Sequence, residues 1–164
     1  MLSSKTMRIL AGLSLALSTV LLSSLTVAKA AESSTVELTR EGSARLPIII
    51  SDKASVEVRK SADELAEYLG KMSGGKFVIE IGNGSRGLVV GQPTDFASLP
   101  FELAFESGPF HREDYVLRSH PNGLYLLGAS DLAVSHAIWD LLYRLGYRQF
   151  FPGPTWEVIP EARD

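Results

Sequence analysis

The sequence predicts a two-layer α/β sandwich (an α+β fold), in which two helices pack on one face of a mixed β-sheet. Two segments carry apolar residues along one side of a helix only, and short runs rich in aliphatic and β-branched residues surround them. Neither helix can bury its apolar side alone, and one face of a single sheet satisfies both. The predicted order of elements is ββαββββα, followed by a short extended tail.

Residues 1–30 are expected to form a secretory signal peptide. Lys5 and Arg8 precede an apolar run over residues 9–27, and Ala28-Lys29-Ala30 is a small-x-small cleavage site. The alternative is a retained membrane anchor, because the run is long enough to span a bilayer. The serines within the run and the cleavage site favour the signal peptide. A mature domain is therefore predicted over residues 31–164, exported to the periplasm or the extracellular space.

The composition narrows the class of protein. Residues 1–30 hold three of the 16 basic residues and none of the 19 acidic ones, so the mature chain has 13 − 19 = −6 net charges. Nucleic-acid partners and anionic membranes require a clustered basic face, so neither is expected after signal cleavage. The chain has no cysteine, which excludes disulfides and leaves stability to the hydrophobic core.

The first half of the mature chain is predicted to form two strands and a helix. The alternating run TVELTREG and the denser apolar run ARLPIIIS are the strands. Asp52 or Ser55 caps the helix, and Ser73-Gly74-Gly75 ends it. Its apolar side consists of Ala62, Leu65, Ala66 and Leu69.

The second half is predicted to form four strands and the second helix. KFVIEIG and RGLVVGQ are joined by a glycine-rich turn, and residues 93–111 form a long loop. DYVLRS and GLYLLGAS flank Asn122-Gly123, a pair that suits a tight hairpin turn. A helix then runs from Asp131 to about Arg144, is capped by Ser130 or Asp131, and stops at Gly146. Its apolar side consists of Val134, Ala137, Ile138, Leu141 and Leu145.

Motifs for cofactors and metals are weak. GNGSRG has the glycine spacing of a dinucleotide fingerprint, but it leads into a strand, whereas the fingerprint must open a helix. A glycine-rich turn is the favoured interpretation. His111, His120 and His136 lack the spacing of a zinc site, so no metal and no cofactor is expected.

Catalytic patterns are also missing. Glycoside hydrolysis needs two carboxyl groups facing each other across a cleft. Glu113 and Asp114 are neighbours whose side chains point to opposite faces of a strand, and nothing in the sequence brings Asp140 and Glu157 together. No G-x-S-x-G pentapeptide is present. No catalytic residue is therefore assigned, and an independent small enzyme is the weakest hypothesis.

The tail LGYRQFFPGPTWEVIPEARD is rich in aromatic residues. Tyr147, Phe151 and Trp156 are the candidate functional residues, either for stacking on sugar rings or for an interface. The alternative is that the phenylalanines fill the edge of the sheet and Trp156 packs at a domain boundary, since aromatic residues mostly serve burial.

Four segments resemble an accessory domain of carbohydrate-degrading enzymes. They are SADELAEYLGKMSGGKFVI, RGLVVGQ, REDYVLRSHPNGLYLLGAS and AIWDLLYRLGYRQFFPGPTWEVIP. Their order is similar to the N-terminal domain of α-glucuronidases and to the domain that precedes the catalytic barrel in β-N-acetylhexosaminidases. It also resembles the front of large exported glycoside-hydrolase-like bacterial proteins. The resemblance covers about residues 36–160.

The resemblance implies a fold and a role. The fold is a mixed sheet with two helices on one face. The catalytic carboxylates of such enzymes lie in the barrel that follows, so none is carried onto this sequence. Phe151, Pro152 and Trp156 would then be a docking seam for a catalytic barrel that is missing from this chain. The alternative is a free-standing carbohydrate-binding module that uses Tyr147 and Trp156.

Overall fold

The computed structural model describes residues 35–97 and 99–161. The predicted signal peptide, residues 1–30, lies outside the described residues. Within the described ranges, no helix is both long and apolar enough to cross a membrane.

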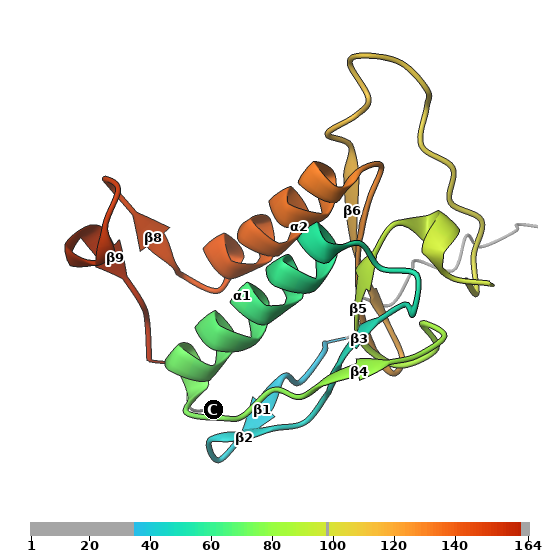
Figure 1. The fold of residues 1–164 in the computed structure, drawn as a ribbon. Helices are drawn as coiled ribbons and strands as arrows, with labels where there is room; N and C mark the ends of the chain where they lie inside the picture. The colour runs from blue at the N-terminus through green and yellow to red at the C-terminus, as the bar shows by residue number, and fades with distance from the viewer. Residues whose placement is uncertain (1–34, 98, 162–164) are drawn as a thin grey trace, which may run out of the picture. The chain divides into compact units, whose positions relative to one another are not determined.

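A five-stranded mixed sheet forms one layer and two helices form the other, which confirms the predicted α/β sandwich. The strand order is β4-β3-β5-β7-β6. Four strands are parallel, and β6 pairs antiparallel with β7 at one edge. The strands are β3 (Ile48–Ile50), β4 (Ile79–Ile81), β5 (Gly87–Gly91), β6 (Tyr115–His120) and β7 (Gly123–Gly128). Helices α1 (Val56–Ser73) and α2 (Asp131–Arg144) lie side by side (Figure 1).

Both faces of the sheet are covered. The main core joins both helices to the strand side chains that face them, which are Ile48, Ile50, Leu88, Val90 and Leu126. The alternate side chains form a second cluster with Phe96 and three apolar residues of the following loop, namely Leu99, Phe101 and Leu103. Strands that are buried on both faces read as continuous apolar runs, which explains the three consecutive isoleucines of β3. The long loop predicted over residues 93–111 therefore serves as the cover of the second face.

A serine side chain caps the N-terminus of each helix. The Ser55 hydroxyl accepts a hydrogen bond from the Val58 amide, and Ser130 accepts one from the Ala133 amide. Of the predicted candidates, Ser55 and Ser130 are thus the caps. Helix α1 ends at Gly74, whose φ of 77° lies in the left-handed region.

The structure differs from the predicted strand pattern near the N-terminal end of the domain. Residues Thr39–Arg40 (β1) and Ser43–Ala44 (β2) form a small hairpin of their own, apart from the main sheet. Glu41 and Gly42 both have positive φ angles, which suits a two-residue turn between antiparallel strands. The expected first strand of the main sheet is therefore replaced by this local hairpin.

The GNGSRG segment is a turn, as interpreted. Gly84 and Gly87 have φ angles of 80° and 81°, and the segment leads into β5 and not into a helix. The two strands that it joins are not neighbours, because β3 lies between β4 and β5. The Tyr125 hydroxyl donates to the Gly84 carbonyl at 3.0 Å and holds the turn against the sheet.

His120, at the end of β6, is held in its neutral form by the β6–β7 turn. Its Nδ1 accepts a hydrogen bond from the Asn122 amide at 3.2 Å, so Nε2 carries the proton toward the Gly87 carbonyl at 3.3 Å. Its ring centroid lies 4.3 Å from that of Tyr125. Burial lowers the pKa of His120 from its ordinary value of 6.5, against a smaller opposing effect of the Gly87 carbonyl.

Acidification is expected to destabilise the fold through His120. A lowered pKa in the folded state means that the unfolded chain binds the proton more tightly, so the free energy of unfolding falls as the pH drops below about 6.5. Urea unfolding at pH about 7.5 and about 5.5 measures this loss. His120→Gln should show a smaller loss between the two pH values than the natural chain. Equal pH dependence of the natural chain and His120→Gln would contradict the assignment.

Candidate functional site

The aromatic tail folds into a hairpin, where an extended segment was predicted. Strands β8 (Arg148–Gln149) and β9 (Glu157–Val158) pair antiparallel, and the 3-10 turn η2 (Pro154–Trp156) lies between them. The Phe150 amide donates to the Trp156 carbonyl at 3.1 Å, which closes the loop. We call residues 148–158 the aromatic hairpin. It projects to one side of the helix layer (Figure 1).

The tip of the aromatic hairpin exposes large apolar side chains. Phe150, Phe151 and Trp156 are 66%, 61% and 51% exposed. The rings of Phe151 and Trp156 meet edge to face, with centroids 5.1 Å apart and an interplanar angle of 68°. The structure thus brings together two of the three residues that the sequence singled out. A contiguous exposed apolar patch often marks an interaction surface, whereas single exposed apolar residues do not.

Tyr147, the third predicted residue, lies inside the protein. It is 3% exposed, and its ring packs against Tyr68 of α1 and Trp139 of α2, with centroids 5.0 Å and 5.3 Å away. Because so little of the ring is exposed, no face of it is accessible for stacking against a sugar. Its role is to anchor the base of the aromatic hairpin to both helices.

A part-buried hydrogen bond next to Tyr147 strengthens this anchor. The Tyr68 hydroxyl donates to the Glu157 carboxylate at 3.1 Å, which ties β9 to α1. The Tyr147 hydroxyl is buried beside them without a hydrogen bond of good geometry. Burial, and then the neighbouring Tyr68 and Glu157, raise the pKa of Tyr147 far above its usual value. The phenol therefore stays neutral, and the aromatic hairpin is held in one position.

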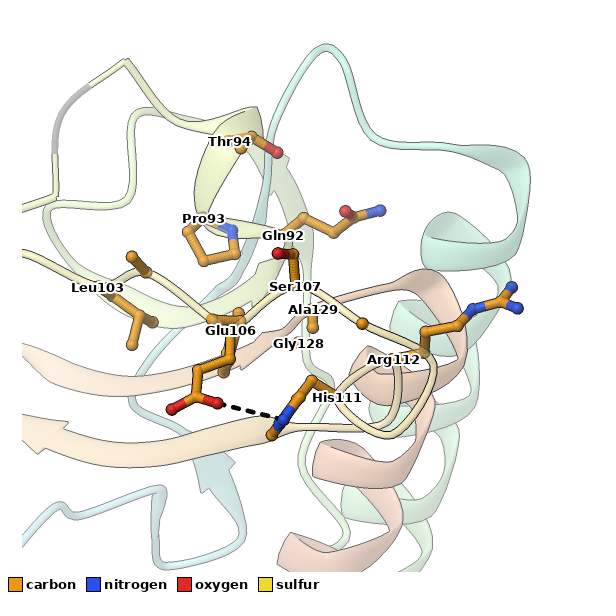
Figure 2. Close-up of a pocket in the computed structure, with 13 residues that line it drawn as sticks. Gln92, Pro93, Thr94, Leu103, Glu106, Ser107, His111, Arg112, Gly128 and Ala129 are labelled. Carbon is orange, nitrogen blue, oxygen red and sulfur yellow. Dashed lines mark ion pairs between the residues drawn. The ribbon is translucent and has the colours of Figure 1, made fainter.

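A second candidate site is a groove at the carboxyl ends of β5 and β7, with a volume of about 460 Å³. These two strands are parallel neighbours, and Gly91 of β5 lies opposite Leu127 of β7. Gln92 and Ala129, which follow the two strands, line the groove together with residues 103–108, His111 and Arg112. We call this cavity the carboxyl-edge groove (Figure 2).

The carboxylates around the groove already have partners. His111 lies between two of them, with Nδ1 2.8 Å from Asp114 and Nε2 3.2 Å from Glu106. Figure 2 shows the Glu106–His111 pair along one side of the groove. Gln92 donates its side-chain amide to Asp131 at 2.8 Å. Arg112, by contrast, has no side-chain partner among residues 35–97 and 99–161.

The sequence prediction missed the carboxyl-edge groove because its wall comes from a loop without periodicity. The ends of the predicted strands could have indicated its place, since ligands in open α/β sheets bind beyond the carboxyl ends of the strands. Gln92 and Ala129 follow two wholly buried strand ends and mark that edge. In the described part of the chain, no three His, Asp or Glu side chains are grouped so that they could hold a metal ion.

The acidic residues considered for glycoside hydrolysis have separate partners. Asp140 pairs with Arg144 at 3.0 Å, and Glu157 accepts from Tyr68. Glu113 lies 3.7 Å from His136 Nδ1, whereas Asp114 bonds to His111.

No protein-family model and no curated protein matches this chain significantly. Its function is therefore inferred from the aromatic hairpin and the carboxyl-edge groove themselves.

Proposed function

We propose that this chain is a non-catalytic accessory domain of an exported carbohydrate-degrading protein, and that it docks on a catalytic barrel domain. The observation that carries the proposal is the exposed aromatic tip of an otherwise anchored hairpin. The resemblance of the segment order to α-glucuronidase N-terminal domains supports the choice of a barrel as the partner.

The composition of the aromatic hairpin suits a protein interface. Phenylalanine and tryptophan are enriched at the centres of interfaces, where a few buried residues contribute most of the binding free energy. A charged group lies at the base of the hairpin: Arg148 stacks 3.8 Å from the ring centre of Tyr143 and donates to the carbonyls of Tyr143 and Tyr147. An apolar centre with a polar surround is the usual anatomy of a docking surface.

The anchor of the aromatic hairpin lowers the cost of docking. Tyr147 and the Tyr68–Glu157 hydrogen bond connect the hairpin to both helices before any partner arrives. Binding by a pre-organised surface loses less conformational entropy than binding by a disordered segment. Phe151 and Trp156 are therefore held in position before a partner binds. Truncating both side chains should weaken docking without unfolding the domain.

The test uses the full chain mixed with the isolated catalytic barrel of an α-glucuronidase, with titration calorimetry as the measurement. We expect a complex, and we expect Phe151→Ala with Trp156→Ala to weaken it at least about 30-fold, because buried interface aromatics contribute about 1 kcal/mol or more each. Leu132→Ala, which removes an exposed apolar side chain of α2 away from the hairpin, is the matched control and should bind like the natural chain.

Two outcomes would count against docking. The first is the absence of a complex with the barrel, and the second is unchanged affinity of the double variant.

A free-standing carbohydrate-binding module is the other candidate function, because the Phe151 and Trp156 rings are accessible. Its signature would be a change in tryptophan fluorescence with millimolar uronic-acid oligosaccharides that Trp156→Ala abolishes. Docking alone predicts no such change.

A further inference from the structure

We propose that Asn83 is a site of spontaneous deamidation, at which the neighbouring Gly84 amide converts the asparagine side chain into aspartate or isoaspartate. The chain holds two Asn-Gly pairs, Asn83-Gly84 and Asn122-Gly123. The two pairs differ in their surroundings, and only the first is arranged for the reaction. This modification is independent of the docking role of the aromatic hairpin.

The reaction needs only the chain and water. The Gly84 backbone nitrogen gives up its proton to water or hydroxide and forms a bond to Asn83 Cγ, while the bond from Cγ to Nδ2 breaks. The side-chain nitrogen takes up a proton and leaves as ammonia, so a succinimide ring remains. Water then opens the ring at either carbonyl, which gives aspartate or isoaspartate. Glycine favours the attack because it has no Cβ atom to hinder the approach of its nitrogen.

The side chain of Asn83 is placed for this attack. Asn83 is exposed in the turn between β4 and β5, so water reaches it. Its Oδ1 accepts a hydrogen bond from the Ser85 amide at 3.1 Å. This local bond folds the side chain back over the Gly84 peptide. The same amide donates to the oxygen on which negative charge develops during the attack, and a backbone donor in that place stabilises the transition state.

The Gly84 nitrogen is available as the nucleophile. Gly84 belongs to no strand, and its amide makes no hydrogen bond within the parts of the chain that the structure describes. Its carbonyl is held instead, because the Tyr125 hydroxyl donates to it at 3.0 Å. The φ angle of 80° is one that glycine adopts without strain. The turn is thus fixed on the carbonyl side of Gly84, and the nitrogen keeps its freedom to react.

The second pair, Asn122-Gly123, lacks these features. Gly123 begins β7 and is paired on both sides, with His120 of β6 and with Gly87 of β5. The Asn122 carbonyl accepts a hydrogen bond from the Gly87 amide at 2.9 Å. Among the described residues, no donor is bonded to the Asn122 side chain. A succinimide at this pair would pull its backbone out of the sheet, so the fold protects Asn122.

The experiment incubates the folded full chain at mildly alkaline pH and follows peptide masses after proteolytic digestion. Replacement of the amide by a carboxyl group raises the mass of the peptide that contains it, and electron-transfer fragmentation separates isoaspartate from aspartate. We expect Asn83 to deamidate at least about tenfold faster than Asn122 in the folded chain. In urea, which removes the fold, the two pairs should react at rates within about threefold of each other.

Hydroxylamine gives an independent readout, because it attacks the succinimide in place of water and cuts the chain between Asn83 and Gly84. Asn83→Gln should abolish this cleavage, since glutamine would have to close a larger ring more slowly. Asn122→Gln is the matched control and should leave the cleavage unchanged.

Three results would overturn the proposal. The first is that Asn83 stays unmodified in the folded chain over the time in which it reacts in urea. The second is that Asn122 reacts as fast as Asn83 in the folded chain. The third is an equal preference for Asn83 in urea and in the folded chain, since the fold would then select neither pair.

Discussion

Ile138→Ala is expected to lower the free energy of unfolding by about 3 kcal/mol. Ile138 has no exposed surface and lies in the middle of α2, within the core that joins both helices to the sheet. The substitution removes three buried carbon atoms from a close-packed site, so apolar contacts are lost and a cavity remains. Urea denaturation followed by circular dichroism measures the change.

Leu132→Ala is the matched control for this prediction. Leu132 is in the same helix and is 55% exposed, so its truncation should change the stability by about 0.5 kcal/mol or less. A similar effect of both substitutions would show that α2 is not buried in the orientation described. Because the sequence pattern already placed Ile138 on the buried side, this prediction also tests the periodicity argument.

Gly128→Ala is expected to lower the free energy of unfolding by about 3 kcal/mol, at the upper end of the range for overpacked sites. The backbone of Gly128 does not have the positive φ that restricts other residues, so the cost is one of space. A Cβ atom there would lie 2.4 Å from the Val134 amide nitrogen and 2.6 Å from the Ala133 carbonyl carbon. These are backbone atoms in the first turn of α2, so the helix itself would have to move away from β7.

Gly70→Ala is the comparison for this substitution. A Cβ atom at Gly70 would lie 3.1 Å from the Gly75 carbonyl oxygen, a tight contact at the end of α1, but alanine favours the helix by up to about 1 kcal/mol. We expect the two effects nearly to cancel. Thermal and urea unfolding of both variants measures the difference. If Gly128→Ala were as stable as the natural chain, the close approach of α2 to β7 would be refuted.

Gly128 connects stability with the candidate site. It lines the carboxyl-edge groove, and the hydroxyl of the nearby Ser130 bonds to the Arg112 carbonyl. Displacement of the first turn of α2 would therefore also displace Arg112.

The parts of the fold that depend on neighbours along the chain could be predicted from the sequence. The apolar sides of α1 and α2 recur with the helical period, and the serine caps and the stop at Gly74 act within one turn. The hairpin between β6 and β7 was also predicted, but its two turn residues are Pro121 and Asn122, between the paired His120 and Gly123, and Asn122 lacks the positive φ that the Asn122-Gly123 prediction assumed. The two-layer fold class followed, because two one-sided helices need a common sheet to cover them.

Which distant segments meet depends on contacts across the fold and could not be predicted from the sequence. The insertion of β3 between β4 and β5 depends on pairing across the sheet and not on the glycine turn that joins the latter two. Tyr147 and Trp156 are both aromatic residues in one short segment, yet Tyr147 became an anchor because Tyr68 and Trp139 cover it. Arg112 and Gln92 meet at one groove only because β5 and β7 end side by side. Periodicity describes the surroundings of a residue within its own element, whereas burial and site geometry depend on contacts between elements far apart in sequence.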